Sequence, residues 1–248
     1  MVLLSSKSLN QKSSFLPKIF EHFPVLINKI SQQSYEELYE ANADGTVSLE
    51  DTLNEVLAEF EKLDPIWCHR CYVWMTLILT LLVEPTADYY QLMDFSPKNL
   101  IMLWLQNNNS TNSNNNIIND DKLIVNQDQN ISKMSDLLTD KNLGSFQTIN
   151  ECLDVFSQAI MVLNYHQSKE ALLEILENCL EGYAIFPGSI GRRELFDWWL
   201  LEVVPASWYL EPPQSFYVVE CLPNREDIKL RQLNTLNQIS SAFWSSFP

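Results

Sequence analysis

The chain has 248 residues, 46% of them apolar, and a formal net charge of −16 that results from 32 acidic and 16 basic residues. The apolar content is sufficient for a packed core, so the composition excludes a disordered protein. A surface this negative repels phosphate groups and no basic patch interrupts it. The charge therefore excludes a nucleic-acid-binding protein and favours either a basic protein partner or simple solubility.

The five cysteines are an odd number, and residues 1–10 lack a charged-then-apolar signal sequence. Both features indicate a reducing compartment, and we expect a cytoplasmic protein. The most apolar run, residues 72–83, spans about twelve residues, whereas a helix that crosses a bilayer needs about twenty. This run therefore predicts a buried core helix and no transmembrane segment.

Residues 40–51, EANADGTVSLED, have the spacing of an EF-hand calcium loop, which places oxygen ligands at positions 1, 3, 5, 7, 9 and 12 and a glycine at position 6. Gly45 occupies the turn position. The ligand positions hold Glu40, Asn42, Asp44, Thr46 (through its carbonyl), Ser48 and Asp51. The loop resembles an EF-hand in this respect, which implies binding of calcium or magnesium. Glutamate at the first position and aspartate at the last depart from the family pattern and favour a smaller, weaker site.

The same residues have a second interpretation that needs no metal. Ser48 and Asp51 form a capping box that opens an amphipathic helix through Phe60. Asp44 and Gly45 are a common turn pair, which would connect this helix to the segment 34–40 in a helix-turn-helix arrangement.

Residues 67–71, WCHRC, resemble the redox motif of the thioredoxin family, since a tryptophan precedes a C-x-x-C and an apolar helix follows it. The resemblance implies a thiol-disulfide enzyme that uses Cys68 and Cys71, and a helix start would lower a thiol pKa. The alternative is that both cysteines are small core residues. A zinc site would need further ligands from His69, His166, Cys152 and Cys179, but these are scattered along the chain, which favours core packing.

Residues 107–132 are rich in asparagine, contain no aromatic residue and lack helical periodicity, which predicts a disordered insertion or linker. We divide the chain into an N-terminal helical part (1–106), an asparagine-rich linker or loop (107–144) and a C-terminal helical part (145–248). The two helical parts are either separate domains or, as we favour, one body with a long loop.

Apolar residues three or four positions apart predict helices in the C-terminal part, one from Ile149 to Leu163 and one from Leu172 to a stop at Gly182. Only five glycines occur in the chain. The predicted fold is all-α, a bundle-like body of several helices with the long loop and at most one short strand. That strand candidate, residues 215–222, would equally suit an extended surface segment.

A helix start near residue 189 offers an anion site. Ser189 and Gly191 lie at the predicted helix N-terminus, where free N–H groups and the helix dipole favour negative charge, and Arg192 and Arg193 follow in the first turn. The alternative is that these arginines pair with nearby carboxylates and fix the start of the helix.

Aromatic residues crowd the same region, and they include Trp198, Trp199, Trp208 and Tyr209. Adjacent tryptophans on a helix point about 100° apart, so both would not reach one core face. Because tryptophan, tyrosine and arginine dominate interface hot spots, we predict a partner-binding surface formed by these four residues with Arg192 and Arg193. The alternative is that the aromatic side chains fill the core.

The sequence contains none of the motifs G-x-x-x-x-G-K, G-x-G-x-x-G, G-x-S-x-G and H-E-x-x-H, so nothing specific supports an enzyme. We expect an acidic helical adaptor, assembly or regulatory factor that binds a partner protein, without a cofactor other than calcium. The alternatives are a calcium- or magnesium-responsive regulator and a thiol-disulfide enzyme. The sequence leaves the oligomeric state open.

Overall fold

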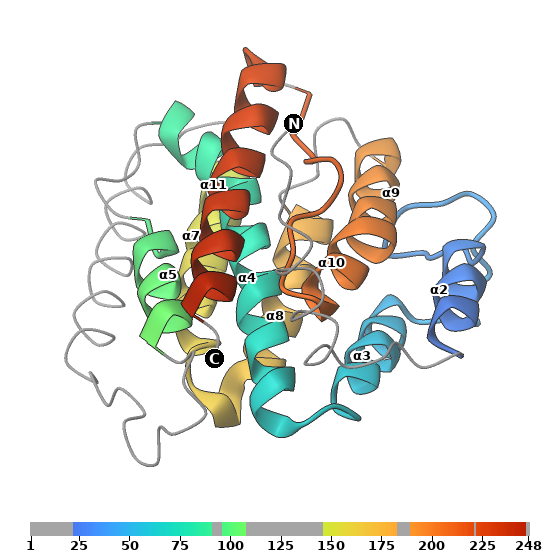
Figure 1. Cartoon of the computed structure of the whole chain (residues 1–248). Coiled ribbons are helices and arrows are strands. Elements are labelled where there is room, and N and C mark those ends of the chain that lie inside the picture. Colours follow the sequence, from blue (N-terminus) through green and yellow to red (C-terminus); the bar gives the residue numbers. More distant parts are fainter. Residues whose placement is uncertain (1–21, 91–95, 108–145, 183–188, 221, 247–248) are drawn as a thin grey trace.

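A computed structural model describes residues 22–90, 96–107, 146–182, 189–220 and 222–246 (Figure 1). Across these residues the fold is all-α, as predicted, and no strand is present. The elements in chain order are α2 (Phe23–Ser31), α3 (Leu49–Phe60), α4 (Pro65–Tyr89), α5 (Lys98–Asn107), α7 (Phe146–Met161), η1 (Tyr165–Gln167), α8 (Ser168–Glu177), η2 (Asn178–Gly182), α9 (Ser189–Trp198), η4 (Trp199–Val203), α10 (Val204–Trp208) and α11 (Arg225–Ser246).

Helix α4 forms the centre of the molecule, with α5, α7, α8, α10 and α11 packed around it (Figure 1). It begins where the Asp64 carboxylate accepts hydrogen bonds from the backbone N–H groups of Ile66 (3.0 Å) and Trp67 (3.2 Å). The helix is long and apolar enough to cross a membrane, but 94% of its most apolar stretch is buried against other helices. A helix that is apolar on all sides is accommodated in the core, which confirms the buried core helix predicted for residues 72–83.

A proline inside α4 is compensated from α11. Pro85 has no N–H group, so the carbonyl of Leu81 loses its normal helical donor. The Gln232 side chain of α11 donates to this carbonyl through Nε2 (3.1 Å), and the same nitrogen lies 3.4 Å from the Glu84 carboxylate. Glu84 also pairs with Lys98 of α5 at 2.7 Å. One polar cluster therefore joins three helices in the core.

The chain reversal after α10 is held by side chains from both ends of the sequence. The indole N–H groups of Trp67 and Trp74 donate to the carbonyls of Trp208 (3.2 Å) and Glu211 (2.9 Å). The buried Leu210 has a left-handed φ of 52°, and its carbonyl accepts a hydrogen bond from Ser240. These bonds satisfy backbone groups that the turn would otherwise leave buried and unpaired.

The two helical parts of the sequence share one core, because a single cluster of buried apolar residues extends from Phe23 to Phe243. The asparagine-rich segment was predicted to separate these parts. Helix α5 ends at Asn107, and residues 108–145 lie outside the described part of the chain.

The predicted C-terminal helices are present as α7 and as α8 with η2, which ends at Gly182 as expected. Two local predictions need correction. Residues 34–40 form turns and not a helix, and Tyr39 has a left-handed φ of 59°. Residues 215–220 are extended or turned but pair with no strand, so the surface-segment interpretation holds for the described part of 215–222.

Candidate functional site

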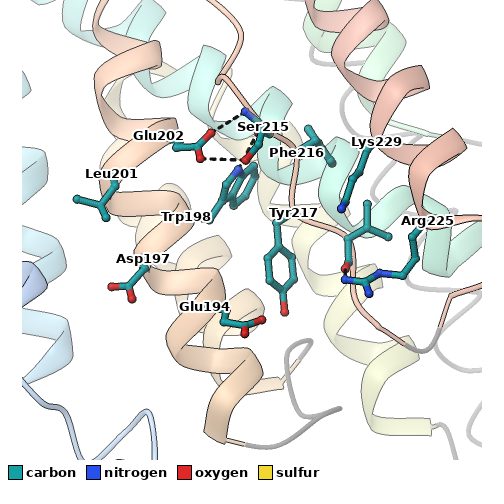
Figure 2. Close-up of a pocket in the computed structure, with 11 residues that line it drawn as sticks. Glu194, Asp197, Trp198, Leu201, Glu202, Ser215, Phe216, Tyr217, Arg225 and Lys229 are labelled. Atoms are coloured by element: carbon teal, nitrogen blue, oxygen red, sulfur yellow. Dashed lines mark hydrogen bonds between the residues drawn. The ribbon is translucent and has the colours of Figure 1, made fainter.

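An open groove of about 350 Å³ lies between α9–η4 and the start of α11, and the extended segment 215–218 forms its floor (Figure 2). We call it the Trp198 groove. Its lining residues are Glu194, Asp197, Trp198, Leu201, Glu202, Ser215, Phe216, Tyr217, Val218, Arg225 and Lys229.

The α9–η4 wall combines carboxylates with apolar groups. Glu194, Asp197, Leu201 and Glu202 recur at helical spacing around Trp198. Figure 2 shows Glu194 and Trp198 on the side of α9–η4 that faces Tyr217, whereas Leu201 and Asp197 point away from Tyr217 on the other side of this helix. Leu201 is 49% exposed.

The shape of this wall follows from a π-helical turn. In η4 the N–H of Val204 donates to the carbonyl of Trp199, five residues earlier, and Pro205 follows immediately. Proline cannot donate an N–H and its ring clashes with the carbonyl of an ordinary helical turn, so the wider π turn accommodates it. Single π turns of this kind are frequent at functional sites.

The floor of the groove is fastened to the acidic wall. The Glu202 carboxylate accepts from the backbone N–H of Ser215 at 2.6 Å and from its hydroxyl at 2.9 Å (Figure 2). The Trp198 indole donates to the Ser215 carbonyl at 3.0 Å. The Tyr217 hydroxyl donates to the carbonyl of Gly191 at 3.3 Å. The segment is thus held in place before any ligand arrives.

The opposite wall is basic, but its cations are engaged. Arg225 donates through Nη2 to the carbonyl of Val218 at 3.0 Å, and Lys229 pairs with Glu226 at 2.8 Å. On the first wall, Asp197 pairs with Arg193 at 2.9 Å. Glu202 accepts only from the neutral Ser215, and Glu194 makes no ion pair with the described residues. Among the described residues, Glu194 and Glu202 on α9–η4 and Arg225 on the opposite wall form no ion pair, so the excess charge of the groove is negative.

The aromatic residues predicted to bind a partner lie mostly in the core. Trp199 and Trp208 are 1% and 0% exposed, and the Trp199 indole points at the Met75 sulfur at 3.3 Å. Trp198 is 7% exposed and Tyr209 is partly buried. The predicted surface needs this correction: Trp199 and Trp208 offer no accessible ring, and only Trp198 lines the groove.

The two arginines predicted to hold an anion clamp the turn 31–40 onto α9. Arg193 donates to the carbonyls of Ser31 and Gln33 (2.7 Å to Gln33), and its Nη1 lies 3.3 Å from the Glu40 carboxylate. The Arg192 guanidinium lies over the ring of Tyr39, 4.0 Å from the centroid. Burial opposes the charge of Arg193, but the neighbouring carboxylates outweigh it and raise its pKa.

These contacts match the alternative in which the arginines fix the start of the helix. Gly191 is buried in the first turn of α9, and Ser189 begins that helix, although its side chain is not among those described. The guanidinium N–H groups of Arg193, which an anion would need as donors, already bond to carbonyls and a carboxylate of the protein.

The loop 40–51 is a turn followed by a capped helix. Gly45 has the left-handed φ of 70° that this turn requires, and Ser48 caps α3 by accepting from the N–H of Asp51. The oxygens that would bind calcium are directed elsewhere: Glu40 faces Arg193, and Asp44 accepts from Thr46 at 2.7 Å. Asn42 and Asp51 are exposed. In the described part of the chain no three acidic, histidine or cysteine side chains gather around a point; calcium binding remains a prediction.

The thiols of Cys68 and Cys71 are both buried and unbonded to each other. The expectation of a lowered pKa is wrong: burial raises the pKa of Cys68 to about 11 and that of Cys71 well above its ordinary value. The Cys71 sulfur lies 3.9 Å from the carbonyl of Trp208, within the core. An activated dithiol would need the thiolate form, which this environment disfavours.

A second pocket, of about 290 Å³, brings together three of the residues considered for zinc, namely Cys68, His69 and His166. His69 is already engaged, since its Nε2 donates to the carbonyl of Val162 at 2.8 Å. Burial lowers the pKa of His69, so the ring is neutral at neutral pH. Cys152 and Cys179 are buried and do not line this pocket.

Sequence reasoning missed most of the groove. Glu194, Leu201 and Glu202 were not singled out, although their spacing relative to Trp198 places them along one side of a helix. Tyr217, Arg225 and Lys229 come from segments whose proximity only the fold reveals. No family model matches the sequence, and a comparison with curated proteins and solved structures finds no significant match. A functional proposal must therefore be based on the residues of the groove.

Proposed function

We propose that this chain is an acidic, cytoplasmic, helical adaptor, assembly or regulatory factor that docks a partner protein at the Trp198 groove. The observation that carries the proposal is a preformed groove lined by Trp198, Tyr217 and the 49% exposed Leu201. Tryptophan and tyrosine are enriched at the centres of protein interfaces.

Three properties of the groove support a protein partner over a small-molecule substrate. The groove is open. Its Ser215 hydroxyl donates to the Glu202 carboxylate, but the backbone N–H of Ser215 occupies the same carboxylate, and the lining holds no histidine. The floor is held rigidly by Glu202 and Trp198, so a partner would lose little free energy in ordering it. The π turn at η4 adds a local distortion of the kind found at binding sites.

Site-specific photo-crosslinking tests this proposal. Leu201 is replaced by benzoylphenylalanine, and the full chain is expressed in cells of the organism that makes it and irradiated. Leu230 of α11, which is 61% exposed but does not line the groove, serves as the matched control position. We expect one covalent adduct of defined mass from position 201 and none from position 230. Equal labelling from both positions, or no adduct from either, would count against docking at the groove.

A further inference from the structure

We infer that the occupant of the Trp198 groove is an extended segment of the partner in which an apolar side chain is flanked by arginine or lysine; this inference rests on the function proposed above. The basic side chain lies against α9–η4, and the apolar side chain contacts Leu201.

The charge distribution selects a basic segment. Glu194 is exposed and forms no ion pair with the described residues, and the carboxylate of Glu202 contacts only the uncharged Ser215. The third carboxylate, Asp197, already shares its charge with Arg193. Two carboxylates on one wall are therefore left without a cation, and a guanidinium or ammonium group would neutralise them.

The opposite wall fixes the orientation of the segment. Lys229 is paired with Glu226, whereas Arg225 donates to the neutral carbonyl of Val218 and forms no ion pair with the described residues. A basic side chain is repelled by this guanidinium and attracted by Glu194 on the other side. The two walls therefore place the positive charge of the occupant next to α9 and away from α11.

The aromatic groups suit the same chemistry. Trp198 packs against Phe216 with ring centroids 5.5 Å apart and against Tyr217 at 6.1 Å, which gives a rigid cluster beside the carboxylates. Tyr217 is only partly buried, and guanidinium groups stack on tyrosine rings. Leu201 adds an apolar contact that a purely electrostatic site would lack.

The dimensions favour a short segment over a folded surface. A volume of about 350 Å³ is at the lower end of the range for ligand pockets. A helix measures about 10–12 Å across with its side chains, so an extended peptide is the smaller occupant.

Three fluorescein-labelled heptapeptides test the inference by fluorescence anisotropy with the full chain. The first is Gly-Ser-Arg-Leu-Arg-Gly-Ser, the second has both arginines replaced by glutamate, and the third has leucine replaced by serine. The protein variants are Glu194→Gln and Leu201→Ser, with Leu230→Ser as control. We expect the first peptide to bind, the glutamate peptide to show no binding, and the serine peptide to bind several-fold more weakly.

In the variants we expect the first peptide to lose affinity by up to about five-fold with Glu194→Gln, the effect of one exposed ion pair. Leu201→Ser should weaken it by a similar factor, and Leu230→Ser should leave it unchanged. The inference is overturned if the arginine and glutamate peptides bind equally, or if both groove variants bind the arginine peptide as the unaltered protein does. The second result would mean that the net charge of −16 attracts the peptide without a site.

The crosslink from position 201 separates this inference from the function on which it rests. If a partner crosslinks there and an excess of the arginine peptide abolishes the adduct, both stand. If the partner crosslinks and the peptide does not compete, docking at the groove stands and the basic segment is wrong. If neither the partner nor the peptide binds, both are wrong.

Discussion

Replacing Arg193 with alanine removes the clamp between α9 and the turn 31–40, and we expect it to destabilise the protein strongly. The guanidinium donates to the backbone carbonyls of Ser31 and Gln33 and contacts the carboxylates of Asp197 and Glu40. Hydrogen bonds that involve a charged group contribute about 1.5–3 kcal/mol each, but they are not additive when one side chain makes several.

Access of water limits the loss of stability that Arg193→Ala causes. The side chain of Arg193 is 22% exposed, and its two carboxylate partners can be rehydrated after the substitution. The carbonyls of Ser31 and Gln33 are the groups that lose most, because each would then need a new donor. We expect a loss of about 3 kcal/mol in the free energy of unfolding for Arg193→Ala. Arg193→Lys should recover less than half of it, because an ammonium cannot reproduce the planar fork of donors.

Urea unfolding followed by tryptophan fluorescence measures this change, with an unchanged dependence on urea as evidence of two-state unfolding. Arg231→Ala is the matched control: Arg231 is 56% exposed and lies 3.9 Å from Asp88, so we expect less than about 0.5 kcal/mol. The reasoning is refuted if Arg193→Ala lies within that margin, or if lysine restores full stability. A stability difference between the unaltered protein and Arg193→Ala that grows with added phosphate would instead favour the anion site.

Three further predictions concern the core. Gln232→Leu should cost about 1–3 kcal/mol, measured by urea unfolding, because the carbonyl of Leu81 then loses its replacement donor; no loss would mean that this carbonyl is satisfied otherwise. Burial lowers the pKa of His69 in the folded protein. The free energy of unfolding is therefore undiminished above the unfolded-state pKa of about 6.5 and falls as the pH drops below it. His69→Gln should flatten the pH dependence of unfolding between pH 6.5 and 5, and an unchanged profile would contradict this. With a pKa of about 11 for Cys68, its thiolate fraction at pH 8 is about 200-fold below that of a free cysteine. Iodoacetamide should therefore label Cys68 and Cys71 slowly in the folded protein and rapidly in urea, as measured by peptide mass spectrometry. Fast labelling of the folded protein would refute their burial.

Local patterns predicted the helices because the information lies within a few residues. The spacing of apolar residues from Ile149 to Leu163 requires one buried side of a helix, and Ser48 with Asp51 marks the start of another. The uninterrupted apolar run of α4 similarly required burial on every side. These features do not depend on which neighbours provide the burial.

The sites depend on contacts that no local pattern contains. Arg193 was recognised as a possible anion ligand, but its acceptors lie more than 150 residues away in the sequence, on the turn 31–40. As predicted from their positions on the helix, the adjacent Trp198 and Trp199 do not share one core face. Trp199 faces α4, but Trp198 is buried too, because the segment around Ser215 lies over it, and the sequence did not predict this.

The segment that lies over Trp198 also explains why the groove exists. The extended segment 215–218 must bury Trp198, and it is held by Glu202 and Trp198 on one side and by Arg225 on the other. Because it adds no strand and carries no helix, it leaves a depression between α9–η4 and α11 that the fold does not fill. Such a floor cannot be removed without exposing Trp198, and its rigidity lowers the ordering cost of binding. For the proposed partner we therefore expect weak binding whose affinity falls as salt is added.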